Sequence, residues 1–223
     1  MTLAPEVSKF SQAQNTDSKH YLNTKWVLWF LKGDRTRSWE ECLKRVAVLE
    51  TVEDFWGLYN NIQPASGLTW GSDFYLFREG IKPMWEDPDN VKGGRWLMVV
   101  ERTKRSERLD VCWLELMLAL LGEQFDDYGA EICGAAVNVR QKGDKVALWT
   151  RDSSKDDVNI AIGRIMRDKL LMSENEQIKY EVHKDASARS CSVIKPKLIL
   201  PPQGAKTAKQ VTNPANPQSS VSQ

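Results

Sequence analysis

The stretch Ile-Cys-Gly-Ala-Ala-Val-Asn-Val-Arg-Gln-Lys-Gly-Asp-Lys-Val-Ala-Leu-Trp-Thr-Arg (132–151) decides the fold. Residues 132–141 and 145–151 alternate in polarity with the period of β-strands. The intervening Lys142-Gly-Asp144 is a turn signal. This stretch therefore predicts a β-hairpin, and with it an antiparallel sheet.

The hairpin carries a pair of cations. Alternation places Asn138 and Arg140 on one face of the first strand, and Lys145 and Trp149 on one face of the second. Arg offers a planar fork and Lys a point charge, a combination that suits phosphates. Two cations on a hairpin are also common as ordinary surface charge, so both interpretations stay open on this stretch alone.

Outside the hairpin, strands outnumber helices. We expect strands at 25–31, 73–77, 94–100, 178–184 and 192–200, and amphipathic helices at 52–62, 109–121 and 156–172. The pattern predicts an α+β domain: one curved, mostly antiparallel β-sheet with three helices on its convex face. Loops would form a ligand slot on the concave face.

The first two helices carry further signals. Thr51-Val-Glu-Asp54 resembles a capping box at the start of the 52–62 helix. The 109–121 helix ends before Gly122, a plausible C-cap, and is more apolar than one buried stripe needs, so part of it is expected to meet a partner. The charged run before it is interpreted as a solvated turn without a role: Arg102, Lys104, Arg105, Glu107 and Arg108.

Composition places limits on the class of protein. The 223 residues carry a net charge of +1, so no global field steers the chain to nucleic acid or to a membrane. The four cysteines are widely separated, which argues against zinc and against a secreted disulfide framework. There is no apolar signal core and no run that approaches the length of a membrane span. We expect a cytoplasmic monomer, with the nucleus as a second compartment.

One domain is expected between two tails. Residues 1–19 are polar and aperiodic and predict a flexible arm, and residues 201–223 are rich in Pro, Gly, Ala, Gln, Asn and Ser and predict disorder. The domain would span 20–200.

Tryptophan is the outlier in the composition. Nine tryptophans are more than a core needs, because each buried indole N–H must find a partner. Trp85 and Glu86 lie between Pro83 and Pro88, which exclude a helix or a central strand. An indole face beside a carboxylate with two acceptors suits a flat cationic ring with two N–H donors, such as N7-methylated guanine. The alternative is that Trp85 caps the core and Glu86 faces solvent.

Trp39 is a second candidate stacking plate. It follows the charged loop that begins at Gly33 and ends at Ser38. Packing against the first strand is the alternative for this ring.

Several segments together resemble the translation initiation factor 4E family, the messenger-RNA cap-binding proteins. They are Thr-Val-Glu-Asp-Phe-Trp (51–56), Pro-Met-Trp-Glu-Asp (83–87), Gly-Gly-Arg-Trp (93–96), Cys-Gly-Ala (133–135), Val-Asn-Val-Arg-x-Lys-Gly-Asp-Lys (137–145) and Ile-Gly-Arg (162–164). The similarity runs from His20 to Leu200.

The resemblance implies a cap site. By position, Trp39 and Trp85 would sandwich the 7-methylguanine, and Glu86 would pair with its N1–H and 2-amino group. The Trp85 backbone N–H would reach O6 of the base. Trp149 would lie beside the N7-methyl group. The residues implied at the phosphates are Arg140 and Lys145, with a contribution from Arg95. The implied ligand is capped mRNA, and neither a cofactor nor a metal ion is implied.

The resemblance also implies a protein partner on the convex face. In the family, a helix with a Tyr-x-x-x-x-Leu-hydrophobic pattern docks there, from the large scaffold subunit (4G) or from 4E-binding repressor proteins. Tyr21 stands where the family has proline, and Ser192 matches its regulatory phosphorylation position. The matching contact positions are His20, Leu22, Val52, Trp56, Leu114, Glu115, Leu118, Leu121 and Gly122.

Three functions compete. The first is a cap-binding translation factor that recruits the scaffold subunit, and the second a cap-binding repressor that does not. The third is a cap hydrolase using Glu86, Asp87 and Asp89 with a metal, which no P-loop, zinc spacing or nucleophile elbow supports. The sequence predicts no enzyme, and it leaves open whether trimethylguanosine caps are accepted.

Overall fold

One eight-stranded antiparallel sheet organises the protein, in the order β2-β1-β3-β5-β6-β4-β7-β8. The structure is a computed structural model that describes residues 19–34, 36–187 and 195–202. The strands are β1 (Tyr21–Leu31), β2 (Leu43–Thr51), β3 (Asp73–Arg78), β4 (Gly94–Val100), β5 (Ile132–Asn138), β6 (Asp144–Thr150), β7 (Ile178–Val182) and β8 (Leu198–Leu200).

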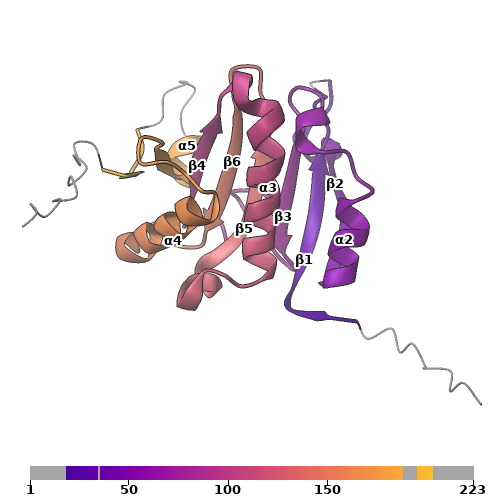
Figure 1. Ribbon diagram of the computed structural model, residues 1–223, viewed down its shortest axis with the longest axis horizontal. Coiled ribbons are helices and arrows are strands. Elements are labelled where there is room, and N and C mark those ends of the chain that lie inside the picture. Colours follow the sequence, from indigo (N-terminus) through magenta and orange to yellow (C-terminus); the bar gives the residue numbers. More distant parts are fainter. Residues whose placement is uncertain (1–18, 35, 188–194, 203–223) are drawn as a thin grey trace, which may run out of the picture.

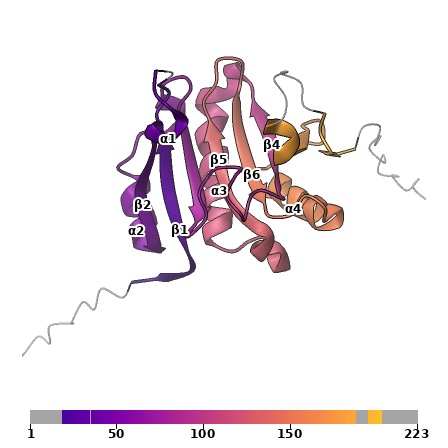
Figure 2. The same ribbon diagram turned by 180° about the vertical axis from the view of Figure 1, so that it is seen from behind.

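The longer helices share one face of the sheet. Figure 1 shows α2, α3 and α4 in front of the strands, and Figure 2, from behind, shows α1 and α5 on the other face. The α-helices are α1 (Trp39–Cys42), α2 (Val52–Tyr59), α3 (Arg105–Leu121), α4 (Asp156–Lys169) and α5 (His183–Ser187). Short 3-10 turns are η1 (Ala65–Gly67), η2 (Arg102–Lys104) and η3 (Asp126–Glu131). The predicted α+β class with three helices on one face is confirmed.

Side-chain alternation gives the sheet two apolar faces. On β3, Phe74 and Leu76 join the main core beneath the helices, whereas Tyr75 and Phe77 belong to a second cluster on the opposite face. Trp149 of β6 lies in that second cluster. The concave face therefore has an apolar floor beneath α1 and the loops.

Some strand predictions were wrong. No strand was predicted for 43–51, but β2 lies there, and β1 begins at Tyr21 rather than at residue 25. Among the strands of the described residues, β2 pairs only with β1, so it is an edge strand of this sheet, and several of its side chains face solvent. Its sequence therefore lacks the alternation of a strand with one buried face.

The other predicted strand and helix ends differ from the observed ends by a few residues. Strand β5 ends at 138, β6 runs over 144–150, β7 ends at 182 and gives way to α5, and of the predicted strand 192–200 only 198–200 is extended among the described residues. Helices α2 and α4 end at 59 and 169.

The ends of helices α2 and α3 test the capping signals that were predicted from the sequence. The capping box is present: Thr51 Oγ1 accepts from Asp54 N, and Asp54 accepts from Thr51 N. Helix α3 starts at Arg105, inside the run predicted as a turn. The first turn of a helix can face solvent before the buried stripe begins, here at Leu109. Gly122 is the C-cap, but Glu123 takes the left-handed conformation, with φ of 51°.

Several predictions fall outside the described residues. These include most of the N-terminal arm and C-terminal tail, and Ser192, so the domain boundaries stay predictions. No helix in the described part of the chain is long and apolar enough to cross a membrane.

Candidate functional site

A pocket of about 420 Å³ opens on the concave side of the sheet. This volume lies within the range of small-molecule sites. Aromatic, acidic and basic side chains from α1, β3, the β3–β4 loop, β4 and β6 meet around it. Its lining is Trp39, Glu40, Tyr75, Pro83, Met84, Trp85, Glu86, Arg95 and Trp149.

Trp39 is held on one wall by a capped helical turn. Ser38 is the N-cap of α1: its hydroxyl accepts from Glu41 N, and the Glu41 carboxylate accepts from Ser38 N at 2.9 Å. Trp39 directly follows Ser38, as the sequence indicated, and is the first residue of α1, a helical turn that was not predicted. With 38% of its surface exposed, the ring is available to a ligand.

Trp85 lies in the β3–β4 loop, as predicted, and is also 38% exposed. The loop is braced from within. Asn90, fully buried, donates from Nδ2 to the carbonyls of Lys82 at 2.9 Å and Met84 at 2.8 Å. Asp87 accepts from the Lys82 N–H at 2.9 Å. Trp85 is thus displayed on a loop whose backbone is already ordered.

Glu86 is exposed, and its carboxylate has no hydrogen-bond or ion-pair partner among the described residues. Its acidic neighbours are engaged: Asp87 braces the loop, and Asp89 pairs with Arg151. No cluster of three metal-ligating side chains occurs in the described ranges. Two of the three carboxylates that the hydrolase alternative would use are therefore occupied by contacts within the protein.

Trp149 forms part of the pocket floor. It is 6% exposed, and its ring packs against Phe77 at 5.3 Å and His183 at 4.1 Å between centroids. The pKa of His183 is lowered to about 3, mainly by burial and also by the charge of Arg95. The imidazole beside Trp149 is therefore neutral at physiological pH.

Arg140 and Asp73 form a bidentate ion pair beside the pocket. Arg140 Nη1 and Nη2 donate to the two Asp73 carboxylate oxygens at 2.5 and 2.9 Å. Burial alone would lower the pKa of Arg140, but the bond and charge of Asp73 raise it. Tyr75 O–H donates to the same carboxylate at 2.8 Å. Sequence reasoning missed both Asp73 and Tyr75, since nothing local marks them.

Lys145 lies near Arg140 and Arg95. It is half-buried, and its ammonium has no hydrogen-bond or ion-pair partner in the described part of the chain. Burial lowers its pKa, and the charges of Arg95 and Arg140 lower it further. Arg95 itself donates to Glu181 at 3.1 Å. Cations held together in this way favour an incoming anion.

A second, smaller groove of about 170 Å³ lies on the helical face. It brings together most of the predicted partner positions and adds Phe55, which was not among them. Its lining is Leu22, Val52, Phe55, Trp56, Leu118, Leu121 and Gly122.

The other three partner positions do not line this groove. Leu114 is half-buried and Glu115 exposed on α3. His20 bonds Glu53 through its backbone N–H and Nδ1, at 3.0 and 2.6 Å. Tyr21 pairs with Thr51 across β1 and β2, so the segment stays extended without proline.

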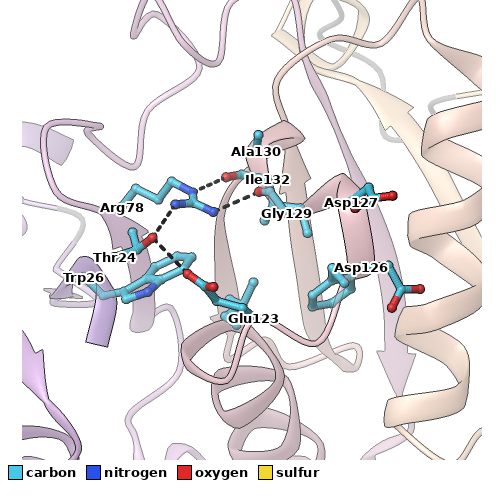
Figure 3. Close-up of a pocket in the computed structure, with 11 residues that line it drawn as sticks. Thr24, Trp26, Arg78, Glu123, Asp126, Asp127, Gly129, Ala130 and Ile132 are labelled. Atoms are coloured by element: carbon cyan, nitrogen blue, oxygen red, sulfur yellow. Dashed lines mark hydrogen bonds between the residues drawn. The ribbon is translucent and has the colours of Figure 1, made fainter. Parts of the chain in front are cut away.

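A third hollow, of about 320 Å³, is shown in Figure 3. Its guanidinium, that of Arg78, is fully engaged. It donates to the carbonyls of Ile132 and Gly129 and to Thr24 Oγ1, at 2.8–2.9 Å, and lies over the ring of Trp26. Arg78 therefore ties β1 and β3 to the η3–β5 junction, which is a structural role.

Comparison with known proteins supports the resemblance. The family model described as Eukaryotic initiation factor 4E matches residues 21–196. Eukaryotic translation initiation factor 4E-3 of Caenorhabditis elegans is 56% identical over 208 residues, which are 90% of this chain and 83% of that protein.

Solved structures of relatives share the fold. Ascaris suum eIF4E-3 in complex with m2,2,7G cap has a TM-score of 0.78 and 62% identity over 83% of this chain and all of that one. The same protein with m7G cap has a TM-score of 0.78 and 61% identity, over 83% of this chain and 100% of that one. C. elegans eIF4E-3 with the 4E-binding protein Mextli and cap analog has a TM-score of 0.76 and 58% identity over 82% of this chain and 100% of that one. The chain therefore belongs to the eukaryotic initiation factor 4E family, whose members are cap-binding translation factors and not enzymes.

Proposed function

We propose that this protein binds the 7-methylguanosine cap of mRNA in the concave pocket and recruits the initiation scaffold subunit through the groove on the helical face. The observation that supports this best is the pocket itself. Trp39 and Trp85, each 38% exposed, border it together with the carboxylate of Glu86, which has no ion-pair partner among the described residues.

The base would be held by stacking and by pairing. The two indoles enclose the methylated guanine, and Trp149 lies beside its N7-methyl group. Each base–aromatic stack is worth about 1–3 kcal/mol, and a desolvated cation–π contact adds about 2 kcal/mol. Glu86 accepts from N1–H and the 2-amino group, and the Trp85 N–H donates to O6. Glu86 has no protein partner among the described residues, so both of its acceptors are available to the base.

The phosphates would meet Lys145, Arg140 and Arg95. Lys145 supplies an unpaired charge, whereas Asp73 and Glu181 already orient the two arginines. An anion also relieves the repulsion among the three cations.

We further propose that both monomethyl and trimethyl caps are accepted. Ascaris suum eIF4E-3, about three-fifths identical to this chain, has been solved with m7G cap and with m2,2,7G cap. Glu86, which lines the pocket, is exposed, so a substituted 2-amino group would lie toward solvent. Because that nitrogen has no N–H in the trimethyl cap, Glu86 would pair with N1–H alone.

The groove favours the proposal that the protein recruits the scaffold subunit over the alternative of a cap-binding repressor that does not bind this subunit. Trp56 and Val52 are exposed at its rim, where a partner helix could bury them. A relative has been solved with the 4E-binding protein Mextli. We propose a monomer that works in the cytoplasm, with the nucleus as a second compartment.

The test is a tryptophan-fluorescence titration with m7GTP, GTP and a trimethylguanosine cap analogue. Wild-type protein should bind m7GTP at least about 10-fold more tightly than GTP, because only the methylated base is cationic. Trp39→Leu and Trp85→Leu should each weaken m7GTP binding about 10-fold. Equal affinity for the two nucleotides would contradict the cation–π sandwich.

A further inference from the structure

A rigid turn displays Trp70 at the entry to β3, away from the pocket. Thr69–Ser72 form a β-turn in which Ser72 N donates to the Thr69 carbonyl at 3.1 Å. Gly71, at the third position, has φ of +91°, which the turn requires and glycine permits. Trp70 is 40% exposed.

The turn is anchored on both sides. Gly71 N donates to the Val139 carbonyl at 2.9 Å, and Val139 N to the Ser72 carbonyl at 3.0 Å. Gly33 packs so closely that a Cβ there would lie 2.6 Å from the Trp70 carbonyl oxygen. The indole is therefore presented on a fixed backbone.

Two guanidinium groups lie within cation–π distance of this indole. The Cζ atoms of Arg105 and Arg102 lie 4.4 and 5.6 Å from the ring centroid. Arg105 is engaged with Asp144 at 3.4 Å. Arg102 has no ion-pair partner among the described residues, so its charge is available to a ligand.

More unpaired charge lies at the same end of the sheet. The side chains of Lys104 in η2 and Lys142 at the hairpin tip are exposed, and neither has a hydrogen-bond or ion-pair partner within the described ranges. A Cβ at Gly143 would contact Val99, so the hairpin tip packs against the end of β4, which leads into η2. We call Trp70, Arg102, Lys104 and Lys142 the basic ridge.

The ridge is continuous with the cations of the pocket. Asp144 accepts from Arg140 N at 2.9 Å and pairs with Arg105 on its other oxygen. Arg140 Nη1 also reaches the Ser72 carbonyl at 3.4 Å, in the turn that carries Trp70. One connected set of contacts thus joins Arg140 to the ring of Trp70.

Acidic side chains reduce the positive charge around the ridge but, within the described residues, do not pair with its cations. Glu101 and Glu107 are exposed nearby, and Asp144 is buried and shared by Arg105 and Arg140. An aromatic plate among free cations is the pattern that binds single-stranded nucleic acid without sequence preference.

We propose that the basic ridge binds the first nucleotides of the RNA chain that follow the cap. This rests on the proposed cap binding, since the cap phosphates would leave the RNA beside Arg140. A base stacks on Trp70, and phosphates meet Arg102, Lys104 and Lys142. The site reads no sequence, because every base offers a stacking face.

The experiment compares m7GTP, the capped dinucleotide m7GpppG and an unstructured capped RNA of about ten nucleotides, a length typical of single-strand sites. Wild-type protein should bind the capped RNA more tightly than m7GTP. Trp70→Ala should remove about 10-fold of capped-RNA affinity and leave m7GTP affinity unchanged. Trp70→Phe keeps an aromatic ring for stacking, so it should retain part of the difference in affinity between capped RNA and m7GTP.

Two charge-reversal variants measure the electrostatic contribution of the ridge to RNA binding. Arg102→Glu should lower capped-RNA affinity and reduce the slope of log Kd against log salt by about 1. Arg164→Glu, the same change at an exposed position on α4, should behave as wild type.

The outcomes separate the two proposals. If wild-type protein fails to bind m7GTP, the cap-binding proposal fails. If it binds m7GTP but gains nothing from the attached RNA, or if Trp70→Ala keeps the full gain, the ridge proposal alone is overturned. Loss of an acidic protein partner in Trp70→Ala, with capped-RNA affinity unchanged, would overturn it as well.

Discussion

Both carboxylate oxygens of Asp73 hold the guanidinium of Arg140, at 2.5 and 2.9 Å. Asp73 is itself buried and also accepts the hydroxyl proton of Tyr75, a residue of the pocket floor. One carboxylate therefore connects the floor of the pocket to Arg140, the arginine that we propose binds the cap phosphates. A fixed arginine loses little conformational freedom when a phosphate arrives.

Asp73→Asn should loosen this arrangement, because the amide presents one acceptor where the carboxylate presents two. The loss of a charge-assisted bond, about 1.5–3 kcal/mol, predicts roughly 10-fold weaker m7GTP binding. Binding of the nucleoside 7-methylguanosine, which has no phosphates, should change little. Equal losses for both ligands would assign Asp73 to the base pocket instead.

Lys145→Met should separate function from stability. Because the pKa of Lys145 is lowered, the folded protein without ligand disfavours its charged form. This cost is present below the folded pKa and disappears as pH rises above the unfolded value. At pH 7 the variant should melt at a higher temperature than wild type, yet bind m7GTP about 10-fold more weakly. A lower melting temperature would show that the ammonium stabilises the free protein.

Local signals explain what could be predicted from the sequence. The hairpin at 132–151 and the capping box at Thr51 depend on residues close in the chain, and both formed. Edge strand β2 and the single turn α1 were missed, because neither has one continuous buried face to impose a period.

Within the site, the exposed residues that line the pocket could be named from the sequence, whereas the residues that hold them in place could not. Trp85 and Glu86 are recognisable from the sequence, because a tryptophan beside a carboxylate is unusual in a loop between two prolines. Asp73 lies 67 residues from Arg140, and their pairing depends on β3 and β5 becoming neighbours. Asn90 looks like any loop asparagine until its two bonds to the Trp85 loop are seen.

Two variants test the groove on the helical face. Trp56→Ala should abolish binding of a Tyr-x-x-x-x-Leu-hydrophobic peptide and leave m7GTP affinity within a factor of about 3, because interface hot spots are local. Trp56 packs against Phe55 and Tyr59, so its loss also removes structural contacts.

Val52→Glu changes the groove without removing the ring contacts that Trp56 makes. Val52 is the first residue of α2, where an acidic side chain is favourable to the helix, yet it lines the groove. It should weaken peptide binding, measured by calorimetry, with no loss of melting temperature. Undiminished peptide binding by this variant would place the partner elsewhere.

Glu86→Gln tests base reading by a nearly isosteric change. One acceptor becomes an N–H donor, which then faces a donor of guanine, and an unpaired buried group costs about 1–3 kcal/mol. We expect at least about 10-fold weaker m7GTP binding and an unchanged melting temperature. Glu107→Gln, the same neutralisation at an exposed position on α3, is the matched control. Wild-type affinity in a folded Glu86→Gln protein would show that Glu86 does not read the base.

His183 should make stability fall as the pH drops from 7 to 5. Its pKa is about 3 in the folded state against an ordinary value of 6.5, so below 6.5 the unfolded chain binds a proton that the folded protein refuses. The free energy of unfolding therefore decreases as the pH falls through this window. Most carboxylates titrate below it. Urea unfolding at pH 7, 6 and 5 measures the slope, and His183→Gln, which keeps a polar side chain against Trp149 but does not titrate, should flatten it. A slope that His183→Gln leaves unchanged would mean that the folded protein accommodates the imidazolium, and that the ring beside Trp149 can become charged.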